Sequence, residues 1–462
     1  MGMLPDDVLL SIFAFCANGE EEDRPQQVWQ TLVHVCPRWR CLVFGSPRSL
    51  NLELICTSRT PARDLLDVWP PLPLVIAPVW FHSDPPIENA DNIVAALEHR
   101  NRACRIYITD ISSFSSSDLE KVLAAMRGPF PELTRLIINL GRKTVAVLPD
   151  LFLGGSAPRL RVLELHCISF LGLPKLLLST THLTDLRLYD IPHSGFISPE
   201  AMITAFSTLG SLGELHLGFR SPLSLPNQAS RRPRSPKRFV LPVLTEFYFA
   251  GVSEYLDDLV ARIDAPRLVR LYVNFFNQIL FDTPQLVQFI TRTPALKAPE
   301  KARVIFKDRV AVIKLSRASG YGDLTVAILC ENMDWQVSSM EQVCTSCLPP
   351  FYTLEDLCIT EDLDLQPDRQ DNIENTLWVE LFQPFTAVKS LYLSEDFAPR
   401  IMPSLKALVG ERTTEALPTL QNIFLEGLET SGPLQTGIQE FVATRQASQP
   451  IAVSRWDRFG SR

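Results

Sequence analysis

The sequence lacks the features that mark membrane, secreted and nucleic-acid-binding proteins. Among its 462 residues no apolar run approaches the roughly 20 residues that a membrane-spanning helix needs. The first residues contain no basic stretch followed by the apolar core of a signal peptide. The formal net charge is −8, so the surplus of Lys and Arg that phosphate contacts require is missing. We therefore expect a protein of the cytoplasm or nucleus that binds neither nucleic acid nor membranes.

Catalytic and metal-binding motifs are missing as well. The sequence has no GxSxG, GxGxxG, P-loop or HExxH motif, and its seven histidines are spread along the chain. Cys344 and Cys347 form the only CxxC motif among ten cysteines, without the second ligand pair that a structural zinc site needs. We interpret this pair as buried core residues, and we expect no enzyme activity, cofactor or metal site.

What the sequence does contain is a repeated apolar pattern in a chain of folding composition, with 46% hydrophobic and 21% charged residues. The pattern LxxLxL recurs at steps of 23 to 34 residues, apart from one gap between Leu271 and Leu357, and these steps are close to the roughly 20–29 residues of leucine-rich repeats. Its second apolar position is occupied by Ile106, Leu136, Leu163, Leu186, Leu215, Phe247, Leu271, Leu357, Leu391 and Ile423.

Each repeat is expected to be one strand followed by one helix. The apolar residues of xLxLx alternate with period two, which predicts a short strand, and segments such as SDLEKVLAAM have helical spacing, with Ser117 as a possible cap. The predicted fold class is therefore α/β, an irregular leucine-rich-repeat solenoid with a curved parallel sheet. The expected segments after the N-terminal helices are a linker and capping repeat at 47–100, repeats at 101–296, divergent repeats or an inserted hairpin at 297–345, repeats at 346–440 and a tail at 441–462.

The first 46 residues carry more apolar surface than a short segment can bury alone. LPDDVLLSIFAF starts at Leu4 with Pro and two Asp, which favour a helix start, and two further helical runs begin at Val28 and Pro37. Segments below about 40 residues usually need outside support to be stable. We expect part of this surface to pack against the first repeat or against another protein.

Residues 4–46 resemble an F-box, whose pattern is Leu-Pro, an apolar helix ending in Ile-Phe, and a Val-Cys-x-x-Trp element. The segment from Ser46 to Ile76 resembles the one that follows the F-box in a large fungal-type group, while the acidic loop 19–23 is longer than in compact F-boxes. The matching residues are Leu4, Pro5, Leu9, Ile12, Phe13, Leu32, Val35, Cys36, Trp39 and Leu42.

The resemblance implies a function in ubiquitin ligation. F-box proteins bind the Skp-type adaptor of a cullin–RING (SCF-type) ligase and present a protein substrate, while other subunits transfer ubiquitin. The alternative is a leucine-rich-repeat interaction scaffold with no ligase role. The residues expected to face or support the adaptor are Leu4, Pro5, Leu9, Ile12, Phe13, Leu32, Val35 and Trp39.

The polar positions between the strand leucines are expected to line the face that holds the substrate. Five of the eight tyrosines fall in this register, and tyrosine offers a large rigid contact area with a polar end. The alternative is that tyrosine simply suits a half-buried strand. The predicted substrate-binding residues are Tyr107, Glu164, His166, Arg187, Tyr189, His216, Tyr248, Tyr272 and Tyr392.

Two polar loops interrupt the repeats. The basic loop 219–239 contains RRPRSPKR, a possible nuclear import signal, and Ser235 before Pro236, a possible phosphorylation site; a solvated insertion is the simpler interpretation. The acidic loop 361–371 lacks the ligand spacing and turn glycine of a calcium loop, so we predict no calcium site there.

Overall fold

The structure is a computed structural model of the whole chain. It describes residues 4–17, 28–47, 49–58, 62–77, 90–109, 115–141, 146–222, 238–278, 280–317, 320, 322–361, 374–395, 397–407, 416–426, 438, 441–443 and 450–456. Within these ranges no helix is both long and apolar enough to cross a membrane.

The chain divides into two compact units. Unit 1 comprises residues 1–197 and 204–209, and unit 2 comprises residues 198–203 and 210–462. The elements of unit 1 are α1 (Asp6–Ala17), α2 (Val28–Val33), α3 (Pro37–Gly45), β1 (Leu54–Cys56), α4 (Ala62–Val68), β2 (Leu74–Ile76), α5 (Ala90–Leu97), β3 (Ala103–Thr109), α6 (Ser116–Ala125), β4 (Arg135–Asn139), β5 (Ala146–Val147), η1 (Phe152–Gly155), β6 (Val162–His166), β7 (Ile168–Ser169), α7 (Leu173–Leu177), β8 (Asp185–Ile191) and η2 (His193–Gly195).

The elements of unit 2 follow α8 (Pro199–Phe206), whose residues are divided between the units. They are β9 (Glu214–Phe219), β10 (Phe239–Val240), β11 (Glu246–Gly251), α9 (Ser253–Val260), β12 (Ile263–Asp264), β13 (Arg270–Phe275), α10 (Pro284–Arg292), β14 (Lys301–Phe306), β15 (Val310–Ser316), β16 (Asp323–Leu329), α11 (Met333–Gln342), the π-turn η4 (Val343–Cys347), β17 (Asp356–Glu361), α12 (Asn375–Phe382), β18 (Ser390–Leu393), α13 (Ala398–Ala407), β19 (Asn422–Glu426) and β20 (Ala452–Trp456).

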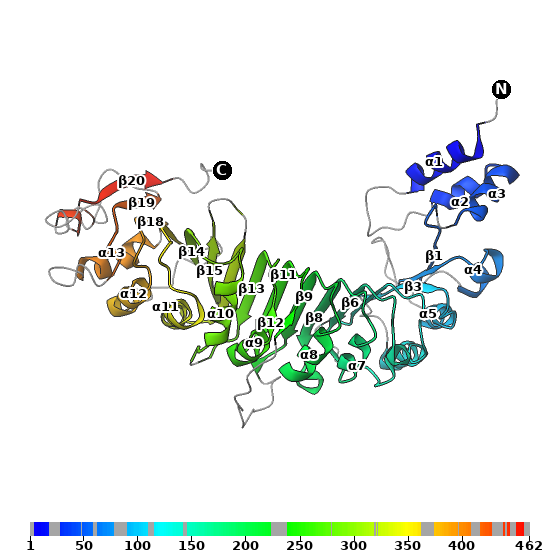
Figure 1. Cartoon of the computed structure of the whole chain (residues 1–462), viewed down its shortest axis with the longest axis horizontal. Coiled ribbons are helices and arrows are strands. Elements are labelled where there is room, and N and C mark those ends of the chain that lie inside the picture. Colours follow the sequence, from blue (N-terminus) through cyan, green and yellow to red (C-terminus); the bar gives the residue numbers. More distant parts are fainter. Residues whose placement is uncertain are drawn as a thin grey trace. The chain divides into compact units, whose positions relative to one another are not determined.

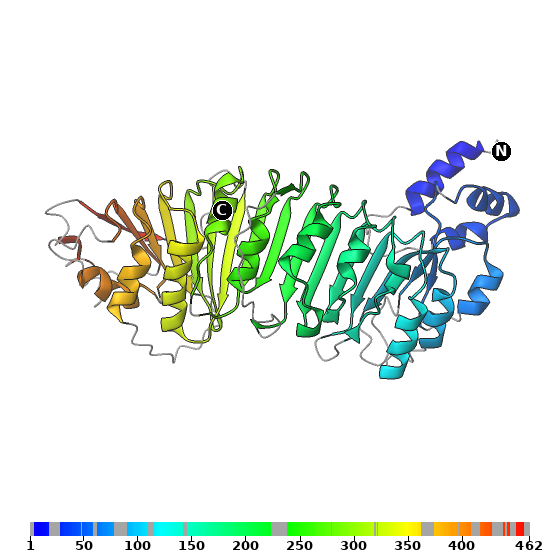
Figure 2. The same ribbon diagram turned by 60° about the horizontal axis from the view of Figure 1, so that its bottom comes forward.

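The main sheet of unit 1 is parallel, in the order β1-β2-β3-β4-β6-β8. Its helices α5, α6 and α7 lie on one face of the strands (Figures 1 and 2). The leucines of the repeat pattern point toward those helices; Leu136, Leu163 and Leu186 are completely buried. The predicted strand-plus-helix repeats with a parallel sheet are therefore confirmed.

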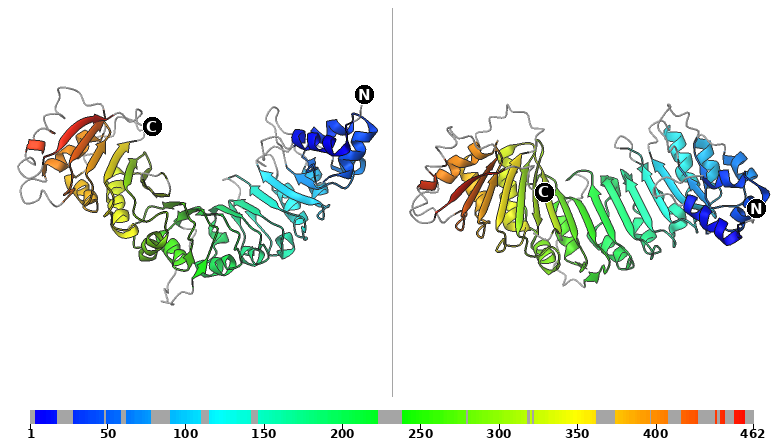
Figure 3. Two further views of the ribbon diagram at one scale, coloured as in Figure 1. Left: turned by 45° about the horizontal axis from the view of Figure 1, so that its top comes forward. Right: turned by 90° about the horizontal axis from the view of Figure 1, so that it is seen from above.

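The sheet of unit 2 has the order β9-β11-β13-β16-β15-β14-β17-β18-β19-β20. Its pairs are parallel except for β14–β15 and β15–β16, which are antiparallel. In space, β16 lies beside β13 and β14 lies beside β17, so the chain passes through this stretch in reverse spatial order (Figure 3). Residues 301–329 thus form an antiparallel insertion of three strands, within the range where the repeat pattern fades.

Consecutive repeats are joined by a ladder of backbone hydrogen bonds just before each strand. The amide of Thr134 donates to the carbonyl of Cys104, Arg161 to Thr134, and Thr184 to Arg161, each at 2.8 Å. In unit 2 the same bonds run from Thr245 to Gly213, Val269 to Thr245, Lys389 to Glu355 and Gln421 to Lys389. The ladder also flanks the insertion, because Asp323 donates to Val269 and Glu355 donates to Glu300.

Local polar contacts fix the helices behind the sheets. Helix α6 begins with a capping box at Ser115, not at the expected Ser117: the Ser115 Oγ accepts from the Asp118 amide at 3.2 Å, and the Asp118 carboxylate accepts from the Ser115 amide at 3.3 Å. In unit 2, the Asp257 carboxylate on α9 accepts from the amides of Gln285 and Leu286 at 2.8 and 3.0 Å. One repeat therefore caps the helix of the next.

The C-terminal region departs from the expected tail at 441–462. Residues 452–456 form strand β20, which pairs in parallel with β19 and places Trp456 opposite Glu426. The strand was missed because AVSRW lacks the leucines of the repeat pattern, and its residues are exposed or half-buried.

Candidate interaction surfaces

The N-terminal helices pack against the start of the repeat array through aromatic rings. The Trp29 ring lies 5.2 Å from that of Trp69, which follows α4, and the Phe44 ring contacts both. The Trp29 indole N–H also donates to the Glu53 carbonyl at 3.2 Å. Part of the apolar surplus of the first 46 residues is therefore buried within unit 1, against the first repeat.

Helix α1 has a second buried face that holds the three helices together. Leu9 and Phe13 are buried, and the Phe13 ring packs edge-on against Trp39 at 4.7 Å. Arg38 on α3 ties down the start of α1, because its guanidinium donates to the Asp6 carboxylate at 2.5 Å and to the Leu4 carbonyl at 2.7 Å. Leu9 and Phe13, which were predicted to face or support a partner, thus have only the supporting position, and Trp39 is half-buried beside them.

A third group of apolar side chains on α1 is exposed. Val8, Ile12 and Phe15 follow one another at helical spacing, with Leu4 one turn before them, and Phe15 is 86% exposed. We name these four residues the N-terminal apolar face. Of the other predicted residues, Pro5 and Val35 are exposed and Leu32 is half-buried. Val8 and Phe15 were not among the predicted contacts, although the spacing i, i+4, i+7 from Val8 already placed them beside Ile12.

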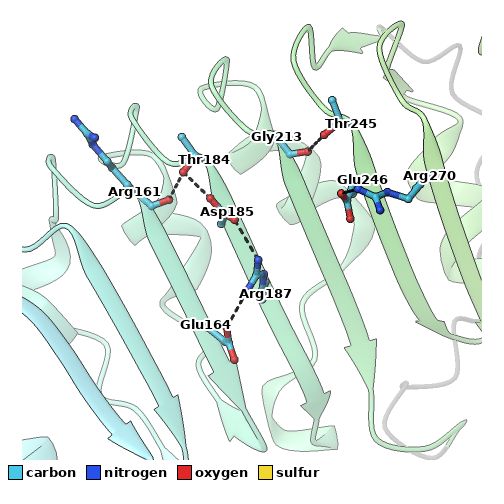
Figure 4. A network of polar contacts seen from close by, with 9 residues as sticks. All are labelled: Arg161, Glu164, Thr184, Asp185, Arg187, Gly213, Thr245, Glu246 and Arg270. Carbon is cyan, nitrogen blue, oxygen red and sulfur yellow. Dashed lines mark hydrogen bonds and ion pairs between the residues drawn. The ribbon is translucent and has the colours of Figure 1, made fainter. Parts of the chain in front are cut away.

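On the open strand face of unit 1, predicted residues form one polar network. Glu164 accepts from the His166 ring at 2.7 Å. Glu164 also pairs with Arg187 at 3.4 Å, and Arg187 pairs with Asp185 at 3.3 Å (Figure 4). The hydrogen bond from His166, together with the Arg187 charge, holds the pKa of Glu164 below its ordinary value although burial opposes this. The Tyr189 ring covers His166 at 4.4 Å.

Tyr107 is an exception to the predicted face. Its side chain is only 8% exposed and packs with Val75, Ala77 and Ile137. At this end of unit 1 the strand positions carry apolar side chains, which cover the ring. Tyr107 is therefore a core residue, and its assignment to the substrate-binding face is corrected.

The open strand face of unit 2 carries two groups of stacked aromatic rings. His216, Tyr248 and Tyr272 stand side by side on β9, β11 and β13, with centroids 5.5 and 5.0 Å apart. Further along the sheet, the Tyr392 ring stacks on Phe424 at 4.5 Å and contacts Trp456 at 5.5 Å. Flat rings stacked in a row offer the rigid contact area that interaction surfaces favour.

Sequence reasoning missed the residues between these aromatic groups. The strand register places Thr325, Lys314, Arg303 and Cys358 in one line from Tyr272 to Tyr392. The available signal was the alternation in VAVIKLS and KARVIF, in which the buried residues flank an exposed Lys314 and an exposed Arg303. The insertion obscured this signal. Its strands are joined by tight turns, so they lack the leucine that precedes each repeat strand in the LxxLxL pattern.

The CxxC pair is buried in the structure. Cys344 and Cys347 lie in the π-turn after α11, and burial raises the pKa of both thiols, that of Cys347 to about 12. Such thiols react slowly because little thiolate forms at neutral pH. In the described part of the chain no three His, Cys, Asp or Glu side chains are grouped as metal ligands would be.

The predicted nuclear signal and phosphorylation site in loop 219–239 lie largely outside the described residues, as do the acidic loops 19–23 and, apart from Glu361, 361–371.

Comparison with known proteins adds little to this description. No family model and no curated protein matches the chain. Among solved structures the chain is similar to the leucine-rich-repeat-containing protein LegL7 from Legionella pneumophila, at 13% identity over 84% of this chain and 97% of that chain, with a TM-score of 0.28. A TM-score this low carries no structural argument, so the repeat architecture rests on the strand register and burial described above.

Proposed function

We propose that this chain is the substrate-recognition subunit of a cullin–RING ubiquitin ligase, acting in the cytoplasm or nucleus. The N-terminal apolar face docks on a Skp-type adaptor, and the open strand faces of the repeats hold a protein substrate. Other subunits transfer ubiquitin, so the chain acts as a receptor without catalytic residues of its own.

The observation that carries this proposal is the exposure of the N-terminal apolar face. The three helices are already fixed by Phe13, Trp39 and the Trp29–Trp69 contact, so the fold leaves Leu4, Val8, Ile12 and Phe15 in water. Fully burying a large apolar side chain is worth about 1.5–3 kcal/mol, so a partner gains most from Phe15, which is 86% exposed, and less from the other three, which are 39–50% exposed. Apolar residues gathered on one helix face are typical of helices that bind in another protein's groove.

The choice of partner follows from the F-box resemblance of residues 4–46. Its Leu-Pro start directly precedes α1, and its Ile-Phe pair lies inside the helix, with Ile12 on the exposed face and Phe13 on the buried face. Leu4, Pro5 and Ile12 are free to contact the adaptor, while Leu9 and Phe13 support the helix from behind. The open strand faces lie on the same chain, which is the arrangement that a receptor joining substrate to ligase requires.

Binding to a purified Skp-type adaptor tests the docking surface. We expect micromolar or tighter binding by calorimetry, and a loss of about a hundredfold in the double variant Ile12→Asp/Phe15→Asp, because two central apolar contacts are replaced by charges. These positions separate binding from folding, since both are exposed, whereas Leu9→Asp would unfold the segment.

The matched control is Leu151→Asp/Leu171→Asp, which makes the same change at two exposed leucines outside the N-terminal helices. It should bind the adaptor like the wild type, and both double variants should keep the wild-type melting temperature. A wild-type chain that fails to bind the adaptor would overturn the ligase proposal and favour an interaction scaffold. Adaptor binding should also lead to ubiquitylation of the chain itself in a reconstituted ligase.

A further inference from the structure

A single row of side chains crosses the open face of unit 2 from end to end. We name it the middle row; its members, from β9 to β19, are His216, Tyr248, Tyr272, Thr325, Lys314, Arg303, Cys358, Tyr392 and Phe424. Along each strand, the residues directly before and after a member of the row are buried. Because successive side chains of a strand point to opposite faces, these neighbours face the helices and the row faces away from them. It consists of two cations between two groups of aromatic rings.

The two cations are placed where the fold alone gains nothing from them. Lys314 and Arg303 are directly paired across antiparallel strands, and both side chains are exposed. Like charges directly opposite each other destabilise a sheet. Neither has an ion pair or hydrogen bond to the described residues, and their outer neighbours in the row, Thr325 and Cys358, are uncharged.

Other charges on the same face are compensated. Arg270 pairs with Glu246 on the neighbouring strand, and Lys301 pairs with Asp356 at 3.8 Å. From β13 to β17, the adjacent row, at the strand starts, contains Arg270, Asp323, Lys301 and Asp356, so its positive and negative charges balance one another. Among the described residues of these two rows, the uncompensated positive charge therefore lies in the middle row, at Lys314 and Arg303.

The spacing of the row matches an extended peptide. From Tyr272 to Tyr392 there are five strand steps of about 4.8 Å, or about 24 Å in total. An extended chain advances about 3.3 Å per residue and turns every second side chain to the same face, so side chains that face the row are about 6.6 Å apart. Four such side chains centred on the row span about 20 Å. Each then lies within about 2 Å of its counterpart, the outer two of Tyr272 and Tyr392 and the inner two of Lys314 and Arg303.

We propose that the middle row of unit 2 binds an extended acidic peptide with aromatic residues on both sides of its negative charges. Two anionic side chains lie against Lys314 and Arg303, and the flanking rings stack on Tyr272 and Tyr392. The assignment to a degradation substrate rests on the proposed function; the binding itself does not. The anionic group is a carboxylate or a phosphate, because both accept hydrogen bonds from Lys and Arg.

Fluorescence anisotropy with the full chain, in the absence of any adaptor, tests this proposal. The probe is a fluorescein-labelled peptide, Tyr-Ser-Glu-Gly-Glu-Ser-Tyr, whose tyrosines and glutamates lie on one face of an extended chain with the spacing derived above. A second probe carries phosphoserine in place of the first glutamate, and a third carries glutamine in place of both glutamates. We expect saturable binding of the acidic peptides, at least tenfold weaker binding of the amide peptide, and loss of affinity with added salt. Tighter binding of the phosphoserine probe identifies phosphate as the preferred group, and equal or weaker binding identifies carboxylate.

The double variant Lys314→Gln/Arg303→Gln should weaken binding of the acidic peptides about tenfold. The control Lys297→Gln/Arg309→Gln removes the same charge from unit 2 at exposed positions outside the row and should bind like the wild type. Equal binding of acidic and amide peptides, no saturable binding at millimolar peptide, or equal effects of the two double variants would overturn the proposal. Since no adaptor is present, failure here leaves adaptor docking untouched, and failure of adaptor docking leaves this result untouched.

Discussion

Replacing Lys314 by glutamate should make the protein more stable. The change turns a repulsive cross-strand pair with Arg303 into an attractive one. Each such pair, of either sign, contributes about 0.2–1 kcal/mol relative to neutral residues. Because both side chains are exposed and screened by water, we expect a net gain of about 1 kcal/mol in the free energy of unfolding of unit 2.

Urea denaturation at low salt measures this gain as a higher transition midpoint with an unchanged slope. Lys314→Gln should give about half of the gain, because it removes the repulsion without adding an attraction. Lys297→Glu makes the same charge change at an exposed site outside the middle row and should alter stability by less than about 0.5 kcal/mol.

The decisive measurement is the double-mutant cycle with Arg303→Gln. If Lys314→Glu stabilises the chain equally in the presence and absence of the Arg303 charge, the pair is not the cause and the reasoning is refuted. A gain that persists in molar salt would refute it as well, since exposed charges are screened there. The same Lys314→Glu variant should lose the acidic peptide, so stability and binding change in opposite directions.

Three further predictions concern the rest of the chain. Phe13→Ala should destabilise the N-terminal helices by about 3–5 kcal/mol, because it leaves a cavity beside Trp39. Hydrogen exchange of the α1 amides measures this loss, and unchanged protection of these amides would contradict the packing. Asp257→Ala leaves two amides of α10 uncapped and should cost about 1–2 kcal/mol in urea denaturation. Asp257→Asn keeps one acceptor oxygen and should cost less, and equal losses in the two variants would contradict the capping role. The lowered pKa of Glu164 means that its carboxylate stabilises the fold at neutral pH and that this contribution is lost as the pH falls through that pKa. The free energy of unfolding of the wild type should therefore exceed that of Glu164→Gln at neutral pH, and the difference should vanish well below about pH 4.3. A difference that is constant with pH would contradict this.

Most of the fold could be predicted from the sequence because each repeat carries its own pattern. The buried positions Leu163 and Leu165 alternate with half-buried ones, and the corner residue Leu160 precedes them at a fixed distance. For residues 297–345 the sequence left divergent repeats and an inserted hairpin as alternatives. It could not decide between them because these strands have the same alternation but depend on partners distant in sequence: β14 pairs with β17, which follows two further strands and a helix. Register between such strands is a property of the folded chain.

The interaction surfaces were predictable only in part for the same reason. Helical spacing placed Ile12 on an apolar face, but whether Leu9 or Phe15 would be the buried residue depended on where α3 packs. The strand register placed Tyr248 beside Tyr272, and both are stacked in the structure. Tyr107 obeyed the same register and is nevertheless buried, because its neighbours Val75 and Ile137 are apolar.

The insertion has a consequence for how such an array can be lengthened. Its strands β14 and β16 run parallel to the repeat strands beside them, and β15 runs opposite to both. Because the number of hairpin-linked strands is odd, the chain leaves the insertion in the direction in which it entered, and the backbone ladder resumes between Glu300 and Glu355. An even number of strands would reverse the direction of the next repeat strand. A hairpin can therefore be added to one repeat strand while the flanking repeats keep their strand direction.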